Sequence, residues 1–267
     1  MTAEETEPCS SPVLEPAWIE VKDLWHEVPQ KTVLKGVNLQ VPPGEIVCVM
    51  GMSGCGKTTL LHCIGGLTEP TRGEIRIGDQ QIVGMGESAL NKVRQRMGMV
   101  FQYAALFDSL SVFENVAFGL RRRQRLSPQE LKDSVAEKLA LVGLPGTEEL
   151  FPSELSGGMA KRVGLARAIA LSPEILLYDE PTSGLDPVVA SVIDELIMQM
   201  RDKLGVTSIV VSHNLPSIFR ISDRIAMLHE GNVLAFGTPD EIRACTNPIV
   251  QQFIQGQSHG PIEVVHR

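Results

Sequence analysis

The stretch GMSGCGKTT, residues 51–59, combines glycines, a lysine and hydroxyl groups in a spacing that suits phosphate binding. Gly51, Gly56, Lys57 and Thr58 match the pattern G-x-x-x-x-G-K-[ST], in which a bare backbone lets successive N–H groups converge on phosphate oxygens. We expect Lys57 to reach the β- and γ-phosphates and the Thr58 hydroxyl to bind Mg²⁺. A glycine-rich turn that happens to contain a lysine is the alternative. The predicted nucleotide-binding residues of this phosphate loop are Gly51, Ser53, Gly54, Cys55, Gly56, Lys57, Thr58 and Thr59.

Cys55 lies inside the phosphate loop and allows two interpretations. Lys57 and the start of the following helix would favour a reactive thiolate at this position. We favour the other interpretation, a small residue at a tolerant position. Our hypothesis is that alkylation of Cys55 blocks nucleotide binding.

A second stretch with chemical potential is EILLYDE, residues 174–180, an apolar run that ends in two acids. Asp179 stands at the end of a predicted buried strand, where a carboxylate binds Mg²⁺, usually through water. Glu180 follows directly and can orient a water for in-line attack on a γ-phosphate. The two acids could instead simply begin a loop, helped by Pro181. Together with the phosphate loop, they favour hydrolysis of a bound triphosphate.

The stretch ELSGGMAKRVGLARAIA, residues 154–170, gives the chain a second helix start that suits an anion. Ser156, Gly157 and Gly158 precede an amphipathic helix, whose first N–H groups attract negative charge. An ordinary N-cap by Ser156 explains the same residues equally well. One nucleotide does not need two such cradles, so the second one requires an explanation.

Alternating strands and helices must position these stretches. The run 45–50 is apolar and β-branched, so the phosphate loop follows a buried strand and precedes a helix that is closed by Gly65-Gly66. This order of strand, loop and helix is the one that a phosphate loop requires. The alternation along the chain predicts an α/β sandwich with a mixed sheet. The other expected elements are strands 18–24, 33–41, 174–180 and 207–213, helices 126–142, 158–171 and 187–203, and a hairpin at 224–237.

Composition argues against several classes of protein. The net charge of −8 disfavours nucleic acid as a direct partner, because phosphate neutralisation needs clustered Lys and Arg. No apolar run reaches the roughly 20 residues that span a bilayer. Residues 1–17 are acidic and contain Pro and Ser, so we expect a disordered lead-in rather than a signal or transit peptide. The five cysteines lack metal-site spacing and predict free thiols in a reducing cytosol.

Over residues 18–254, the sequence resembles the ABC transporter ATPases. The motifs occur in the order of that family: the phosphate loop, Gln102, the signature 155–159, the strand 175–180, SGLD at 183–186, and His213. The resemblance implies a P-loop NTPase of the ABC ATPase fold, with a RecA-like core, a mixed sheet and an inserted α-helical subdomain at about 100–165. Residues 255–267 are then a C-terminal tail.

The same resemblance implies a homodimer and explains the second cradle. Two domains pack head to tail, and each ATP, with its Mg²⁺, lies between the phosphate loop of one copy and the signature of the other. Ser156, Gly157 and Gly158 then contact the γ-phosphate of the nucleotide held by the second copy, and Asp186 works across the dimer.

Further roles are carried over from the family onto matching positions. Glu180 is the catalytic carboxylate, and Thr58, Gln102 and Asp179 are the predicted metal residues. Gln102 senses Mg²⁺ and couples to a membrane subunit, and His213 contacts the γ-phosphate. His213 could otherwise be a structural residue at the end of a strand.

The sequence departs from the family pattern at two places. The signature ends in Met159, where the family usually has Gln. The usual position of the adenine-stacking tyrosine falls near Val28, with Trp25 and His26 close by. We predict that Trp25 stacks on the base, although it could equally belong to the core.

A narrower resemblance points to the cargo. FQYAALFDSLSVFENVAFGLR (101–121) and PSELSGGMAKRVGLARAIAL (152–171) are similar to the ATPases that serve MCE-protein lipid transporters, the Mla type of the bacterial envelope. This implies a peripheral ATPase on the cytoplasmic face of the inner membrane, with integral-membrane permease subunits and an MCE-domain substrate-binding protein. Those partners handle phospholipid moved between the inner and outer membranes. The alternatives are the ATPase of an importer for amino acids or other small solutes, and a soluble ABC protein that is not a transporter.

Three segments outside the nucleotide site allow two interpretations each. The side chains of Tyr103, Leu106, Phe107, Leu110 and Phe113 form an apolar cluster near Gln102. This cluster is either a groove for a coupling helix of the permease or interior packing of the helical subdomain. RRRQR, residues 121–125, faces anionic headgroups or, as we favour, is a solvated helix face. The segment 246–267, which includes the tail, is either frayed or bound to a neighbouring subunit.

Overall fold

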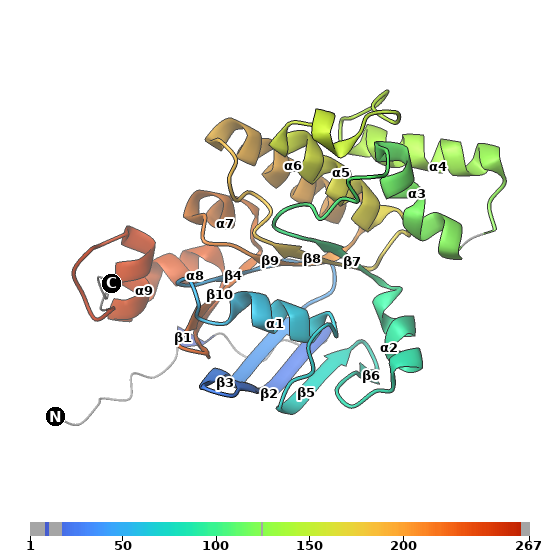
Figure 1. Ribbon diagram of the computed structural model, residues 1–267. Helices are drawn as coiled ribbons and strands as arrows, with labels where there is room; N and C mark the ends of the chain where they lie inside the picture. The colour runs from blue at the N-terminus through green and yellow to red at the C-terminus, as the bar shows by residue number, and fades with distance from the viewer. Residues whose placement is uncertain (1–8, 11–17, 124, 263–267) are drawn as a thin grey trace. The chain divides into compact units, whose positions relative to one another are not determined.

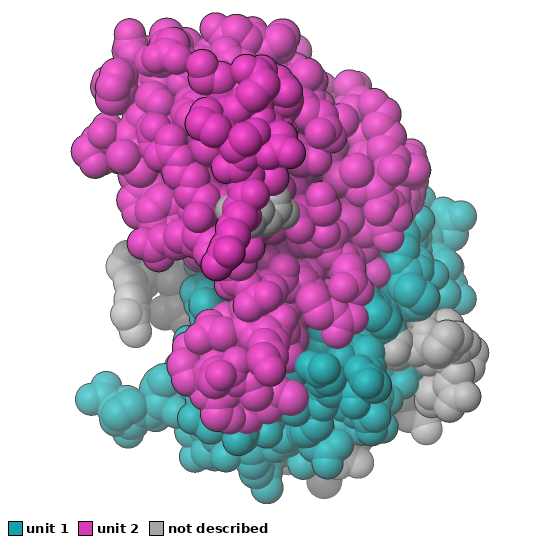
Figure 2. Space-filling model, turned by 90° about the vertical axis from the view of Figure 1, so that its right-hand side faces the viewer, with its two compact units in different colours: residues 1–84, 211–267 teal, residues 85–210 magenta. Residues whose placement is uncertain are grey.

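The computed structural model describes residues 9–10, 18–123 and 125–262 and contains two compact units. Unit 1 comprises residues 1–84 and 211–267, and unit 2 comprises residues 85–210 (Figure 2). Of the predicted lead-in 1–17, only β1 (Cys9–Ser10) is among the described residues, and residues 263–267 of the predicted tail also lie outside them. Within these described ranges, no helix has both the length and the apolar character that spanning a membrane requires.

Unit 1 contains an antiparallel sheet in the order β3-β2-β5-β6. Its strands are β2 (Ile19–Val28), β3 (Lys31–Val41), β5 (Arg72–Ile77) and β6 (Gln80–Gln81). The prediction ended the first strand at residue 24, whereas β2 continues to Val28. The register between β2 and β3 shifts at three places between Val21 and Glu27, and these bulges interrupt the alternation on which the prediction relied.

The strand that leads into the phosphate loop pairs within unit 1 with one strand of a hairpin. β4 (Ile46–Met50), all of whose residues are buried, lies parallel to β10 (Arg224–His229). β10 forms the predicted hairpin with β11 (Asn232–Gly237), and β11 lies parallel to β1. The buried strand and the hairpin are therefore confirmed. α1 (Lys57–Ile64) follows the loop, and the unit also contains α7 (Leu215–Ile221), α8 (Pro239–Ala244) and α9 (Pro248–Gln255).

The described part of the tail, residues 256–262, is held against α9. Gln252 is 4% exposed, and its Oε1 accepts a hydrogen bond from the Ile262 N–H at 2.7 Å. Gln252 Nε2 donates to the Ile262 carbonyl at 3.2 Å, and Ile262 itself is buried. The interpretation as a frayed end is therefore wrong for this part of the tail.

Unit 2 contains three neighbouring strands and the long helices. β8 (Ile175–Asp179) lies between β7 (Met97–Val100), to which it is parallel, and β9 (Thr207–Val211). The helices are α2 (Glu87–Arg94), α3 (Val112–Arg123), α4 (Pro128–Leu141), α5 (Gly157–Ile169) and α6 (Pro187–Leu204), with a short 3₁₀ turn at Pro152–Glu154.

The helices α3, α4 and α5 pack against one another (Figure 1). The three helices predicted at 126–142, 158–171 and 187–203 are confirmed as α4, α5 and α6, with ends shifted by one or two residues. The predicted helical subdomain at about 100–165 covers α3, α4 and most of α5, and its boundaries remain a prediction.

Candidate functional site

The phosphate loop begins directly after β4 and ends inside α1, as the sequence predicts. Gly51, Gly54 and Gly56 have φ angles of +148°, +76° and +109°, which only glycine adopts without strain. A Cβ on Gly51 would lie 2.1 Å from the Leu228 carbonyl oxygen, and one on Gly56 would lie 2.9 Å from Leu34 Cδ2. The loop is therefore a closely packed bare backbone, of the kind that a phosphate cradle needs.

Two lysines and a helix N-terminus give this loop a positive character. Lys57 is 8% exposed, and its ammonium donates hydrogen bonds to the carbonyls of Gly51 (2.8 Å) and Met52 (3.0 Å). Lys31 Nζ donates to the Gly54 carbonyl at 3.2 Å. The first turn of α1 contains no acidic residue, and its N-cap, Gly56, has no side chain that could occupy the first N–H groups. These features favour an anion at the start of α1.

The remaining residues of the loop differ in their exposure. Ser53 and Thr58 are exposed, Thr59 is partly exposed and Cys55 is buried. Burial raises the pKa of the Cys55 thiol more strongly than the charge of Lys57 lowers it. The interpretation of Cys55 as a reactive thiolate is therefore wrong. Cys48, Cys63 and Cys245 are likewise buried free thiols, as predicted.

His213 lies close to the start of the phosphate loop. It is exposed and follows Ser212, whose N–H donates a hydrogen bond to the Val49 carbonyl in β4 at 3.2 Å. The segment after β9 is thus attached to the strand that leads into the loop.

Trp25 is half-buried in β2. Its indole Nε1 donates to Asp23 Oδ1 at 2.7 Å, and the Arg72 guanidinium lies 4.1 Å from the ring centroid. Because Arg72 covers one face of the ring, base stacking by Trp25 remains a prediction for the other face only.

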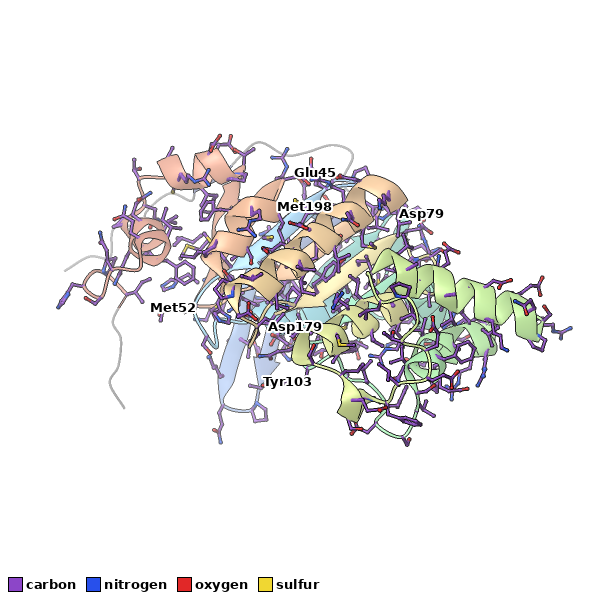
Figure 3. All side chains as sticks on the ribbon, turned by 90° about the horizontal axis from the view of Figure 1, so that it is seen from above. Glu45, Met52, Asp79, Tyr103, Asp179 and Met198 are labelled. Carbon is purple, nitrogen blue, oxygen red and sulfur yellow. The ribbon has the colours of Figure 1, made fainter. Side chains whose placement is uncertain are left out.

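In unit 2, the predicted metal ligand and the predicted catalytic acid lie next to each other where one buried strand ends. Asp179 is the last residue of β8 and is buried (Figure 3). Glu180, 9% exposed, follows with a φ of +48°, a left-handed conformation that carries strain in a residue other than glycine. Lys161 Nζ donates to the Glu180 carbonyl at 3.4 Å. Burial lowers the pKa of Lys161, and the negative charge of Glu180 partly opposes this.

Gln102 lies at the same edge of these strands as the two acids. β7 and β8 are parallel neighbours, so their carboxyl ends meet, and Gln102 is the second residue after β7. Its Nε2 donates to Ser183 Oγ at 3.3 Å. The structure therefore brings Gln102, Asp179 and Glu180 to one edge of unit 2.

The signature residues begin α5. Ser156 is the N-cap, and its Oγ accepts a hydrogen bond from the Met159 N–H at 3.3 Å, which confirms the predicted capping role. Ser156 and Gly157 are exposed, whereas Gly158 is buried. A Cβ on Gly158 would lie 2.5 Å from Val189 Cγ1, so this glycine permits close packing of α5 on α6.

Asp186 is the N-cap of α6, a role that the sequence interpretation did not assign to it. Its Oδ1 accepts hydrogen bonds from the N–H groups of Val188 and Val189, each at 3.0 Å. The pair Asp186-Pro187 before an apolar helix is the signal that predicts such a cap. The side chain is exposed, and its role across a dimer remains a prediction.

Lys161 and Arg167 of α5 are functional candidates that the sequence interpretation missed. Lys161 Nζ donates to the Ser183 carbonyl at 2.6 Å, beside its contact with Glu180. Arg167 donates to the carbonyls of Ala104 (2.8 Å) and Ala105 (2.7 Å). The available signal is a set of three cations, Lys161, Arg162 and Arg167, on a helix made otherwise of small and apolar residues, because a buried cation needs oxygen partners.

The predicted metal residues offer oxygen donors, the ligand type that Mg²⁺ prefers: the Thr58 hydroxyl, the Gln102 amide and the Asp179 carboxylate. In the part of the chain that the structure describes, no group of three His, Cys, Asp or Glu side chains could hold a metal ion. Mg²⁺ is commonly bound by one or two carboxylates together with substrate phosphates and water, so the donor set fits this ion.

Comparisons with known proteins show the family to which the chain belongs. The family model described as ABC transporter matches residues 34–183, which include the phosphate loop, Gln102, the signature and Glu180. The intermembrane phospholipid transport system ATP-binding protein MlaF of Escherichia coli (strain K12) is 42% identical over 91% of each chain. MlaF of Haemophilus influenzae is 44% identical over 91% of this chain and 92% of its own length.

A solved structure extends the agreement to the fold. The dimeric ATP-binding cassette MJ0796 bound to ADP and Pi superposes with a TM-score of 0.77 and is 33% identical over 83% of this chain and 98% of that one. This supports the predicted ABC ATPase fold. Motif order, local geometry and these similarities together show that the chain belongs to the ABC transporter family, as an ATP-binding subunit that hydrolyses ATP.

Proposed function

We propose that the chain is the ATPase subunit of a transporter that moves phospholipid between the inner and outer membranes with an MCE-type system. The observation that carries the proposal is the identity of 42–44%, over 91% of the chain, to proteins named for intermembrane phospholipid transport. The stretches 101–121 and 152–171, which resemble MCE-associated ATPases, support the same assignment.

In this proposal, the phosphate loop binds ATP. Lys57 exchanges its contacts with loop carbonyls for contacts with the β- and γ-phosphates, and the N–H groups at the start of α1 bind the same phosphates. Thr58, Gln102 and Asp179 would hold Mg²⁺, which would supply positive charge to offset the charge that develops on the phosphate oxygens.

Hydrolysis depends on Glu180 in this proposal. Its carboxylate orients the attacking water and accepts a proton from the water oxygen. His213 binds the γ-phosphate as a hydrogen-bond donor. Lys161 binds the carbonyl of Glu180 and so helps to hold its left-handed backbone directly after β8.

Two copies form the active assembly. Ser156, Gly157 and Gly158 of one copy contact the γ-phosphate bound to the other copy, and Asp186 acts across the same interface. The exposure of Ser156, Gly157 and Asp186 supports this role, and the solved cassette MJ0796 is a dimer.

The assembly binds permease subunits at the cytoplasmic face of the inner membrane. The MCE-domain protein handles the lipid outside the ATPase, and no nucleic acid is needed. The exposure of the apolar cluster supports a docking surface for the permease, since Tyr103 is 86% exposed and none of the five members is buried.

Purification of the intact complex from membranes, with mass spectrometry of its proteins and lipids, tests the proposal. We expect this chain, a permease and an MCE-domain protein, together with phospholipid that a mock purification lacks. A soluble solute-binding protein in place of the MCE-domain protein would favour an amino-acid or small-solute importer. Recovery of the chain without any membrane protein would favour a soluble ABC protein.

A further inference from the structure

Two cations of α5 hold the backbone of the two loops that carry the candidate catalytic side chains. Lys161 binds the turn after β8 through the carbonyls of Glu180 and Ser183. Arg167, two turns further along α5, binds the loop after β7 through the carbonyls of Ala104 and Ala105. Burial lowers the pKa of both cations, because it partly removes their charges from water.

The loop and the turn both contain strained backbone at the points where these cations bind. Ala104, Ala105 and Glu180 have φ angles of +58°, +49° and +48°. Left-handed residues other than glycine persist only where the surroundings fix them. The carbonyl oxygen of each of the three accepts a hydrogen bond from Arg167 or Lys161, so these contacts help to fix the strained backbone.

The loop after β7, the turn after β8 and α5 each contact the other two. Gly164 lies between the two cations on α5, and a Cβ on it would be 3.3 Å from Ala104 Cβ, so the loop after β7 lies directly against the helix. Gln102 Nε2 donates to Ser183 Oγ, which joins that loop to the turn after β8. A shift of either segment therefore breaks a contact to α5 or to the other segment.

We propose that Lys161 and Arg167 are positioning residues for ATP hydrolysis, which fix Gln102 and Glu180 to the signature helix. The proposal rests on the proposed roles of Gln102 and Glu180. According to this proposal, α5, which begins after Ser156, is rigidly connected to Gln102 and Glu180. Loss of either cation therefore slows hydrolysis without weakening the binding of ATP to the phosphate loop of unit 1.

Purified full-length variants test this proposal. Arg167→Ala and Lys161→Met remove one cation each, and Arg167→Lys keeps the charge but not the paired donors. Arg162→Gln is the matched control, because Arg162 also lies on α5 and donates to two carbonyls, those of Val142 and Gly143, away from both loops. The measurements are kcat, KM for ATP, thermal unfolding, and hydrogen exchange of residues 101–107 and 179–185.

For Arg167→Ala and Lys161→Met we expect kcat to fall at least tenfold, KM to change less than twofold, and exchange to rise in the released segment. Arg167→Lys should recover part of kcat, and Arg162→Gln should match the wild type. The proposal is overturned if kcat of Arg167→Ala and Lys161→Met stays within twofold of the wild-type value. It is also overturned if nucleotide affinity and unfolding temperature fall in parallel with kcat. Absence of hydrolysis by the wild type would refute the proposed function, whereas exchange would still report whether the cations fix the two segments.

Discussion

Glu180 illustrates how one residue can combine several constraints. It directly follows a buried strand, adopts a left-handed backbone, and its carbonyl accepts a hydrogen bond from Lys161, so its backbone is fixed before any substrate binds. Such pre-organisation is valuable for a group that must orient a water molecule.

Replacement Glu180→Gln should therefore separate hydrolysis from binding. Glutamine keeps the size of the side chain but cannot accept the proton, so kcat should fall by about 10²–10⁴-fold while MgATP still binds. Phosphate release and nucleotide affinity measure the two effects. Glu174→Gln is the matched control, because Glu174 precedes the same strand and pairs with Arg96 at 2.9 Å. Wild-type turnover in Glu180→Gln would contradict the assigned role.

Alkylation of Cys55 should be slow in the folded chain. Its pKa is raised by burial, so at pH 8 a smaller fraction is thiolate than in the unfolded chain, and the rate should keep rising at pH values where an ordinary cysteine has already titrated. Iodoacetamide labelling followed by mass spectrometry, with and without urea, measures this. Faster labelling of Cys55 in the folded protein would contradict the expectation.

Site residues could be predicted from the sequence where their role depends only on neighbouring residues in the chain. The glycines and Lys57 of the phosphate loop are recognisable because the conformation that they permit is confined to a few consecutive residues. Lys161 and Arg167 were not predictable in the same way, since their partners lie 19–22 and 62–63 positions away in the chain.

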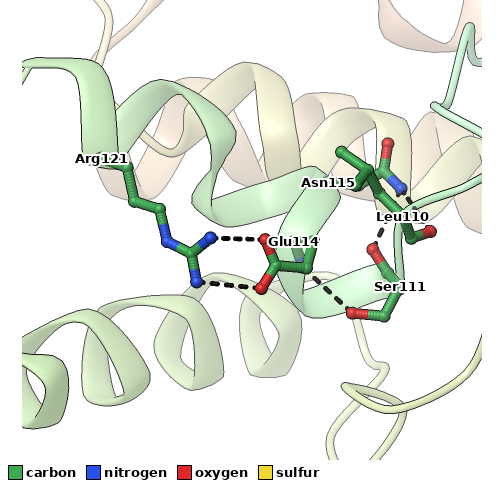
Figure 4. A network of polar contacts seen from close by, with 5 residues as sticks. All are labelled: Leu110, Ser111, Glu114, Asn115 and Arg121. Atoms are coloured by element: carbon green, nitrogen blue, oxygen red, sulfur yellow. Dashed lines mark hydrogen bonds and ion pairs between the residues drawn. The ribbon is translucent and has the colours of Figure 1, made fainter.

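At the scale of elements, Asn115 fixes the loop that carries the apolar cluster. It is fully buried in the first turn of α3, and its Oδ1 accepts from the Phe107 N–H at 2.8 Å; Figure 4 draws Asn115 with Leu110 and Ser111. Its Nδ2 donates to the carbonyls of Leu110 and Ser111, each at 3.0 Å. One side chain thus satisfies several backbone groups of a loop that has no regular structure.

Asn115→Ala should lower the free energy of unfolding by about 2–3 kcal/mol, because it leaves buried backbone groups without partners. Glu114→Ala is the matched control. Glu114 forms a two-point ion pair with Arg121 on the helix surface, which contributes about 0.5 kcal/mol or less. Urea unfolding measures both variants, and equal losses would contradict the assignment of the larger effect to burial.

The ion pair between Glu114 and Arg121 also helps to interpret the basic stretch 121–125. Arg121 is paired with Glu114, and the Arg122 guanidinium lies 4.4 Å from the centroid of the Phe118 ring. Two of the arginines therefore already have partners on α3, which favours a solvated helix face over a headgroup site.

Elements were predictable where their signals are continuous. α4 begins with a capping box of Ser127 and Glu130, and Gly205 ends α6 in the left-handed conformation, so both signals lie within a few consecutive residues. β2 was only half recognised because bulges interrupt its alternation. The fold of the described part of the tail was not predictable, since it depends on the buried Gln252 amide that binds the backbone of Ile262.

At the scale of the whole molecule, the apolar cluster is a candidate contact with the permease. Phe107 is 42% exposed, and its ring packs on Phe118 at a centroid distance of 4.7 Å. A charge at this position should weaken association with the permease, because docking would bury the carboxylate in an apolar interface. Phe107→Asp should therefore recover less permease in a pull-down and bind ATP normally. Phe151→Asp is the control, since Phe151 is similarly exposed (45%) and lies outside the cluster.

The two anion cradles of the chain allow a decisive test of the dimer. Suppose that each ATP lies between the phosphate loop of one copy and the signature of the other. The number of intact sites then depends on whether Lys57→Ala and Ser156→Arg are on separate copies or on the same copy. On separate copies, one of the two composite sites stays intact. On the same copy, paired with a wild-type copy, each site carries one defect. In a Glu180→Gln background, differently tagged mixed complexes should therefore retain one occluded MgATP when the two substitutions are on separate copies, and none when they are on the same copy.

A site formed within a single copy predicts the reverse result. The wild-type copy would then keep its own site whole, whereas two separately damaged copies would keep none.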